Sequence, residues 1–233
     1  MIISIHSPKT GGMSFREILE QSWPNKIFYV YGIKPSEPGA LNRIKGYFKV
    51  YKFRKEIKKT AQNNSFKCIH GHFFADTFDT VIENRQYSMW FRSPVQLVIS
   101  KYYFYQRYNW QDNYFNKLFQ KKKISIEEFS SFPTMQNSQK RFLSTKKISD
   151  LDFIGITEEY DKSIKLFCKI FKVKNSFRIP KVNTNPRKRN VIQVYTPDQK
   201  VYNVLEENNK DDMIIYKNAC NRFKELCKMH QIK

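Results

Sequence analysis

The sequence predicts a single α/β domain over residues 1–233, with a mainly parallel sheet flanked by helices. Short β-branched runs alternate with segments whose apolar residues recur at helical spacing. The first run leads through a glycine turn into a helix, which is the entry unit of P-loop-like, nucleotide-binding α/β folds. No repeat or low-complexity linker divides the chain, and its length suffices for one substantial core.

The elements expected in the N-terminal part begin with a strand. Residues 2–6 (IISIH) form a β-branched run that stops at a Ser-Pro pair. A helix should follow the glycine turn, because Phe15, Ile18 and Leu19 recur at helical spacing. We expect a second strand at 27–31, and then a loop rich in glycine and proline.

The segment 43–59 predicts a basic helix after this loop. Its apolar stripe consists of Ile44, Tyr47, Phe48 and Tyr51. Only one acidic residue, Glu56, accompanies its cations, which are Arg43, Lys45, Lys49, Lys52, Arg54, Lys55, Lys58 and Lys59. The segment therefore predicts a local basic surface, and we expect it to match an acidic acceptor better than nucleic acid.

The remaining elements continue the alternation toward the C-terminus. The middle of the chain, 108–147, is rich in aromatic residues and lysines and predicts short helices with loops. The expected strands are 66–70, 87–91 and 152–157. The expected helices run from Val95 to about Arg107, over the apolar residues Ile164, Phe167, Cys168 and Phe171, from Thr196-Pro197-Asp198 onward, and over 211–230.

The charge balance is strongly basic, with 42 Lys+Arg against 21 Asp+Glu and a formal net charge of +21. A field of this sign attracts nucleic acid, acidic lipids, nucleotides or acidic polysaccharides, and it does not choose among them. Aromatic residues supply 16% of the chain, which excludes a disordered protein. No run of about 18 apolar residues occurs, so we expect no transmembrane segment.

The cysteines and the N-terminus indicate a reducing compartment. The first residues have no basic region followed by an apolar one, so we expect no secretory signal and a cytoplasmic protein. No CxxC pair or Cys/His metal spacing occurs, and we expect no metal site. The four cysteines are Cys68, Cys168, Cys220 and Cys227.

The first strand runs into the loop SPKTGGMS at 7–14, which has the chemistry of an anion cradle. Glycines admit a close backbone approach, amides at a helix N-terminus point at phosphate oxygens, and Lys9 adds charge. A Walker A loop places its lysine after the glycines, whereas here the lysine precedes them, which disfavours a metal-dependent NTPase. The alternative is a glycine-rich turn with an incidental lysine.

Four segments resemble motifs of one enzyme family, the carbohydrate sulfotransferases that use 3′-phosphoadenosine 5′-phosphosulfate (PAPS). The loop HSPKTGGMSF resembles the family's PKTGG[ST]SF loop. IHGHF resembles the HGH segment of the heparan/uronyl 2-O-sulfotransferase branch, and MWFRSPVQLVISKYYF resembles the R-[DN]-P-[VI]-x-R-x-x-S-x-[YF] segment. FIGITEEYDKSI resembles the G-[VIL]-T-E unit. The similarity spans roughly 2–171 and implies the sulfotransferase fold.

The resemblance implies how PAPS is bound. The residues implied to bind its 5′-phosphosulfate are Pro8, Lys9, Thr10, Gly11, Gly12, Met13 and Ser14. Lys9 is expected to neutralise the leaving phosphate, and Arg92 and Ser100 to hold the 3′-phosphate. A structural salt bridge for Arg92 and a helix-surface position for Ser100 are the alternatives. Arg187 and Lys188, followed by Arg189, form either a basic loop over the nucleotide or a solvated turn.

Histidine is the residue whose pKa best suits a general base near neutral pH. Side chains alternate along a strand, so His70 and His72 should point to the same side. The resemblance implies that His72 is the base, with His70 as its neighbour or substitute, while ordinary polar positions are the alternative. His6 is expected only to flank the phosphate loop. Glu158 is expected to cap its own helix or to orient a substrate.

Three positions depart from the family pattern. Met13 replaces a usual hydroxyl residue, Ser93 stands where an acid is common, and Leu97 where an arginine is common. The first departure removes one phosphate donor, and the third removes a positive charge.

These observations predict a PAPS-dependent O-sulfotransferase that moves a sulfuryl group to a hydroxyl of an acidic or growing glycan, with no metal and no nucleic-acid partner. Peripheral membrane contact stays open. Most animal members of the family carry a Golgi membrane anchor, and we expect none here, which fits a bacterial cytoplasmic enzyme or a trimmed chain. The alternative is a non-catalytic protein that binds nucleic acid or another polyanion, which the aromatics after Arg92 would favour: Tyr102, Tyr103, Tyr105, Tyr108 and Trp110.

Overall fold

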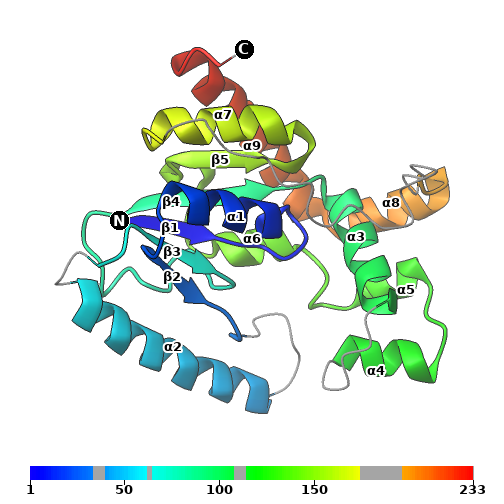
Figure 1. Cartoon of the computed structure of the whole chain (residues 1–233). Coiled ribbons are helices and arrows are strands. Elements are labelled where there is room, and N and C mark those ends of the chain that lie inside the picture. The colour runs from blue at the N-terminus through cyan, green and yellow to red at the C-terminus, as the bar shows by residue number, and fades with distance from the viewer. Residues whose placement is uncertain (34–39, 62–64, 108–113, 174–195, 233) are drawn as a thin grey trace.

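A computed structural model describes residues 1–33, 40–61, 65–107, 114–173 and 196–232. Its centre is one five-stranded sheet in the order β2-β3-β1-β4-β5, with every neighbouring pair parallel (Figure 1). The strands are β1 (Ile2–Ile5), β2 (Ile27–Val30), β3 (Cys68–Gly71), β4 (Gln86–Phe91) and β5 (Phe153–Ile156). The predicted α/β class with a parallel sheet is confirmed.

Helices follow the strands as the sequence predicts. The α-helices in the described part are α1 (Gly12–Ser22), α2 (Ala40–Ala61), α3 (Pro94–Arg107), α4 (Tyr114–Lys121), α5 (Ile126–Ser131), α6 (Ser138–Leu143), α7 (Tyr160–Ile170), α8 (Gln199–Glu207) and α9 (Lys210–Met229). Two 3-10 turns complete the set, η1 (Ile148–Asp150) and η2 (Thr157–Glu159). None of the helices described combines the length and the apolar character that a bilayer crossing requires.

The sheet is covered on both faces, which explains why its strands read as unbroken apolar runs. On one face, Phe15 of α1 lies 5.0 Å from the ring of Phe167 on α7 and 5.1 Å from the ring of Trp90. On the other face, α9 buries Ala219 and Phe223 and packs against β5 (Figure 1). All residues of β1, β3 and β5 are buried.

One expected strand starts later than the sequence pattern indicates. The run 66–70 predicts a strand from Phe66, but β3 begins at Cys68. The Phe66 ring instead packs 5.3 Å from the ring of Phe28, and the Lys67 amide donates to the carbonyl of Lys26. These two residues therefore form the approach to the strand.

A second apolar cluster joins α3, α4, α5 and α8. Its buried members include Val98, Phe115, Phe129 and Leu205. The partly buried rings packed against it include Tyr102, Tyr103 and Tyr105. These three tyrosines pack against the cluster, so their presence after Arg92 has a structural explanation. Tyr108 and Trp110 lie outside the described residues.

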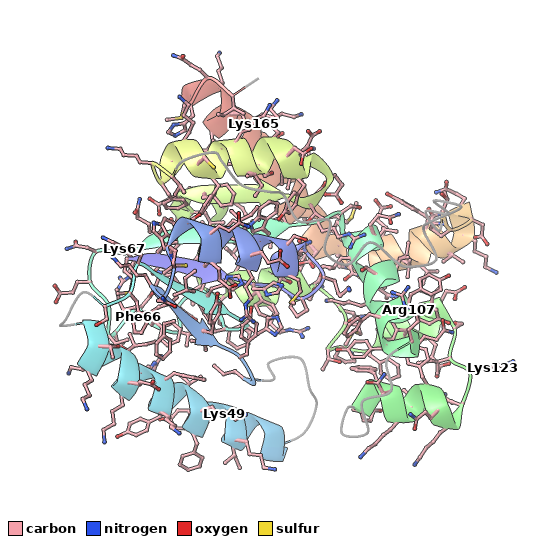
Figure 2. All side chains as sticks on the ribbon, viewed as in Figure 1. Lys49, Phe66, Lys67, Arg107, Lys123 and Lys165 are labelled. Carbon is pink, nitrogen blue, oxygen red and sulfur yellow. The ribbon has the colours of Figure 1, made fainter. Side chains whose placement is uncertain are left out.

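The positive charge is spread over several elements. Lys49 lies on α2, Lys67 before β3, Arg107 at the end of α3, Lys123 after α4 and Lys165 on α7 (Figure 2). A charge of one sign on so many elements gives a broad attractive field for anions, with local maxima where cations adjoin.

Candidate functional site

The sheet order brings the loop after β1 and the segment after β4 together. β1 and β4 are neighbours, yet the chain leaves β1 toward β3 and β2, and leaves β4 toward β5. Such a point, where the connections diverge, is the usual ligand position at the carboxyl edge of a parallel sheet. The loop of Ser7–Gly11 and the residue Arg92 both follow at this edge.

The loop 7–14, for which the sequence predicts phosphate binding and which is called the phosphate loop below, has an unusual backbone. Lys9 and Gly11 both adopt left-handed conformations, with φ of 73° and 84°. The Thr10 hydroxyl donates to the Ser7 carbonyl at 2.8 Å and ties the loop into a turn. The Ser7 hydroxyl is buried and has no hydrogen-bond partner in the described part. A buried hydroxyl without a partner is rare, so Ser7 is an unsatisfied polar position beneath this loop.

The two glycines of the loop have different reasons to be glycine. Gly11 takes the positive φ that other residues rarely adopt. At Gly12, a Cβ would lie 1.8 Å from the Nε2 of His6, so the ring packs directly on the helix start. His6 therefore supports the N-terminus of α1 and does more than flank the loop.

Thr157 fastens the loop to the neighbouring strand. Its hydroxyl lies 3.1 Å from the Thr10 carbonyl and 2.9 Å from the Phe91 carbonyl, so its one proton is shared between them. No role for this residue follows from the sequence, because Thr157 and Thr10 lie 147 positions apart and only the sheet order makes them neighbours.

Glu158 does not cap its own helix, as one of the two expected roles would require. Its carboxylate accepts from the Ser93 amide at 2.9 Å and from the Tyr216 hydroxyl at 3.0 Å. It thus binds the amide that precedes α3, and the other expected role, a substrate contact, stays a prediction. A negative charge at a helix N-terminus is stabilising.

Arg92 is held by its backbone and points toward the loop. Its amide donates to the Gln139 side chain at 2.8 Å, and its carbonyl accepts from the same amide group at 2.9 Å. Its Nη1 donates to the Lys9 carbonyl at 3.1 Å. Among the described residues no ion pair forms at Arg92, which disfavours the salt-bridge alternative. Burial lowers the pKa of Arg92, while Glu158 acts in the opposite direction.

Lys9 lies close to other cations and has no described carboxylate partner. Its Nζ lies 4.5 Å from the centre of the Phe104 ring. Burial lowers its pKa to about 8, and the charges of Arg92 and Arg107 add to this effect. This uncompensated positive charge favours a multiply charged anion at the loop.

Three histidines gather on the sheet face that α1 covers. Ser4 pairs with His70 in the register of β1 and β3, and His6 and His72 continue the same rows two residues later. The His6 ring lies 5.3 Å from the ring of His70 and 4.6 Å from the ring of His72, so it stands between them. Tyr31 closes the cluster at 4.9 Å from His72.

His70 and His72 differ in access. The Nδ1 of His70 is bonded to the Ser4 hydroxyl at 2.9 Å, and the residue is 1% exposed. Burial lowers its pKa to about 3. His72 follows the end of β3, is only partly buried as a residue, and has a pKa lowered by burial to about 4. His72 is therefore the better placed of the two to meet a ligand at the edge.

The remaining predicted residues lie as follows. Met13 is 49% exposed, and Ser14 lies against the Tyr160 phenol. Ser100 is half-buried on α3. Arg187 and Lys188 lie outside the described residues.

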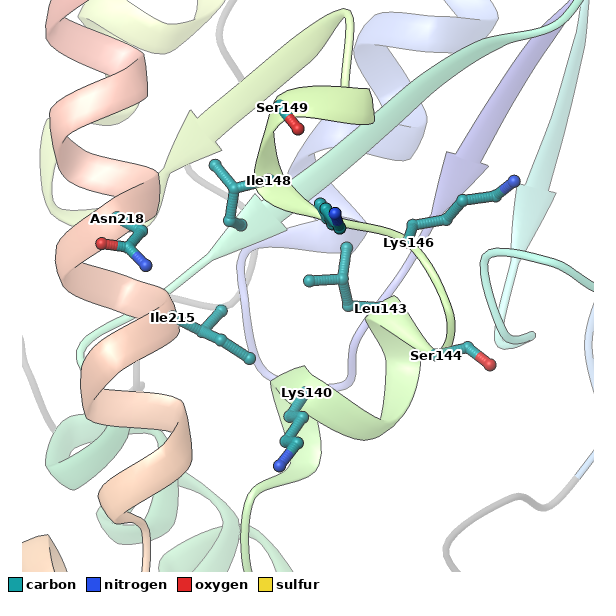
Figure 3. Close-up of a pocket in the computed structure, with 9 residues that line it drawn as sticks. Lys140, Leu143, Ser144, Lys146, Ile148, Ser149, Ile215 and Asn218 are labelled. Carbon is teal, nitrogen blue, oxygen red and sulfur yellow. The ribbon is translucent and has the colours of Figure 1, made fainter.

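A pocket of about 520 Å³ lies between α6, η1 and α9 (Figure 3). Two of its lysines already have carboxylate partners, because Lys140 pairs with Asp211 and Lys146 with Asp79. The pocket contains none of the residues predicted for the site.

Comparisons of the chain with protein-family models, with curated proteins and with solved structures find no match. The fold and the site define an α/β protein with a parallel sheet and a positively charged, glycine-containing loop at the switch point of that sheet.

Proposed function

We propose that this protein is a PAPS-dependent O-sulfotransferase that transfers a sulfuryl group to a hydroxyl of a carbohydrate acceptor. The observation that carries the proposal is the meeting of the phosphate loop, Arg92 and the histidine cluster at one edge of the sheet. Arg92 reaches the Lys9 carbonyl, and His6 joins Gly12 of the loop to His72.

The donor groups at this edge suit a nucleotide with several negative charges. Lys9 and Arg92 are positive and lack carboxylate partners among the described residues. The amides at the start of α1 add further donors. These groups would hold the 5′-phosphosulfate, with Arg92 and Ser100 directed to the 3′-phosphate.

Each residue then has one task in the transfer. The acceptor oxygen forms a bond to sulfur while the bond between sulfur and the 5′-phosphate oxygen breaks, and adenosine 3′,5′-bisphosphate (PAP) leaves. Lys9 neutralises the charge that develops on the leaving phosphate. The Nε2 of His72, which is buried and has no described partner, accepts the proton of the acceptor hydroxyl.

The lowered pKa of His72 keeps its ring neutral at pH 7 and able to accept a proton. A pKa of about 4 makes a weak base in the free protein. Negative charge beside the ring favours the protonated form, so a bound sulfuryl group would raise this pKa toward the useful range. The base is thereby strengthened when the substrate is present.

The broad positive field supports an acidic or growing glycan as the acceptor. The test is transfer of label from radiolabelled PAPS to a panel of acidic and neutral glycans, together with thermal shifts. We expect PAP to stabilise the wild type and ATP with Mg²⁺ not to do so. Lys9→Ala and Arg92→Ala should lose the shift, whereas Lys165→Ala, an exposed lysine on α7, should keep it. Stabilisation by ATP with Mg²⁺ alone, and no labelled product, would refute the proposal.

A further inference from the structure

Helix α2 carries an apolar stripe on its outer side. The stripe consists of Ile44, Tyr47, Phe48 and Tyr51, which are 53%, 71%, 67% and 62% exposed. They make up four of the eight large hydrophobic side chains that are exposed among the described residues. Single exposed apolar residues are ordinary, but a contiguous group on one helix face marks an interaction surface.

The stripe is not the face by which α2 packs on the protein. Val50, Phe53 and Ile57 lie on the opposite side of the helix and contact the core, with the Phe53 ring 6.1 Å from that of Phe28. α2 lies beside the β2 edge of the sheet, and no described element lies beyond its outer side (Figure 1). The stripe is therefore exposed although the helix already has an apolar inner face.

Exposed lysines surround and extend the stripe. At 100° per residue, Lys55 and Lys58 continue its line along the helix, and Lys45, Lys52 and Lys59 form one flank. Glu56 is the only acidic residue in the helix. Between this flank and the inner face, Lys49 donates to the Gly32 carbonyl at 2.9 Å and ties the helix to the end of β2.

We propose that the outer face of α2 binds the surface of an anionic lipid membrane. Ile44 has neither a polar group nor a ring that could stack on a sugar or a base, and together with Phe48 it suits the boundary between headgroups and acyl chains. Tyr47 and Tyr51 have the amphipathic rings that gather at this boundary. The lysines supply the charge complementary to acidic headgroups, at about fivefold in affinity for each lysine near the surface. This inference does not depend on sulfuryl transfer.

The test is co-sedimentation of the full chain with vesicles of phosphatidylcholine, with and without about 30% phosphatidylserine, over a range of salt concentration. We expect the wild type to bind the anionic vesicles and to lose binding as salt rises. The double variant Tyr47→Ser/Phe48→Ser should bind at least about tenfold more weakly than the wild type, because it loses two apolar rings. Lys55→Glu/Lys58→Glu should also lose binding.

Two matched control variants distinguish binding through the outer face of α2 from a general effect of protein charge or of exposed rings. Lys224→Glu/Lys228→Glu makes the same charge change on exposed positions of α9, and Tyr114→Ser removes a ring that is 46% exposed on α4. Both should bind as the wild type does, and circular dichroism checks that every variant is folded. The proposal is overturned if the wild type does not prefer anionic vesicles, or if the controls lose as much as the α2 variants. It is also overturned if the α2 variants keep vesicle binding and instead lose binding to an acidic polysaccharide or an oligonucleotide.

Discussion

The close packing of His6 on the start of α1 predicts a large effect of one methyl group. In Gly12→Ala, the new Cβ would lie 1.8 Å from the Nε2 of His6, 2.1 Å from its Cδ2 and 2.2 Å from its Cε1. The added atom thus meets the face of the ring. The ring has little room to move, because it lies between His70 and His72 and its Nδ1 is 3.4 Å from the Tyr31 hydroxyl.

The cost follows from the displacement that is needed. Real Cβ atoms keep at least 3.0 Å from such neighbours, so the distance from Gly12 must grow from 1.8 Å to that value. Either the ring or the first turn of α1 must shift. Overpacking of a filled interior costs about 1–3 kcal/mol, and we expect the upper part of this range, about 2–3 kcal/mol. The shift also displaces the amides of the phosphate loop, so affinity for PAP should fall.

Urea unfolding at pH 7 measures the free-energy change. Gly46→Ala is the matched control, because nothing lies within 4 Å of a Cβ at that helical position, and it should gain about 0.5–1 kcal/mol. In a His6→Ala background the ring is gone, and Gly12→Ala should then cost less than about 1 kcal/mol. A steric clash between the new Cβ and His6 is refuted if Gly12→Ala unfolds at the wild-type urea concentration. It is also refuted if the loss in free energy of unfolding is unchanged when His6 is alanine.

Three further predictions follow from the geometry of the site. Thr157→Val removes the hydroxyl that lies between two carbonyls and should lower the free energy of unfolding by about 1–2 kcal/mol, whereas Thr157→Ser should retain most of it; equal losses in urea titrations would contradict this. Lys9 has a pKa of about 8, so affinity for PAP, measured by calorimetry, should fall as pH rises through about 8, and a Lys9→Met variant that keeps this dependence would disprove the role. The lowered pKa values of His70 and His72 mean that the unfolded chain binds more protons than the folded one between pH 6.5 and about 4. Stability should therefore fall as pH drops through this window, and the fall in melting temperature should be smaller in His70→Asn; an unchanged slope would argue against a neutral buried ring.

The strands and helices could be predicted because their signals are local. Residues 2–6 are β-branched, and the recurrence of Phe15 and Ile18 depends only on the period of a helix. The apolar pattern predicts the start of β3 two residues too early, because the apolar Phe66 is typical of a strand but packs against the ring of Phe28. Local pattern identifies which residues are apolar and leaves open what they contact.

The stripe on α2 illustrates the same limit. Its spacing predicts a helix with one apolar face, and the apolar face of a surface helix is ordinarily the buried one. The structure instead packs Val50, Phe53 and Ile57 against the core and leaves Tyr47 and Phe48 outside. Both faces carry apolar residues, so the choice depends on which side meets the sheet, and that is a property of the tertiary packing.

The candidate site divides in a similar way. The glycine turn, the lysine before it and the charge of Arg92 can be recognised in the sequence because each is a matter of residue type and short spacing. The alternation of His70 and His72 also follows from the geometry of a strand. The position of His6 beside both does not, since His6 directly follows a different strand, β1, and comes 64 residues before His70 in the chain.

By itself the sequence determined an α/β fold and a basic protein, and it predicts an anion-binding loop, because composition and short-range periodicity act within a few residues. Only the tertiary structure decided that Thr157 ties this loop to β4, that the His6 ring packs against Gly12, and that the stripe of α2 faces outward. The physical reason is the strand order β2-β3-β1-β4-β5, which makes neighbours of segments far apart in the chain. Local propensity does not predict such pairings, because they arise when apolar faces distant in the chain are buried together.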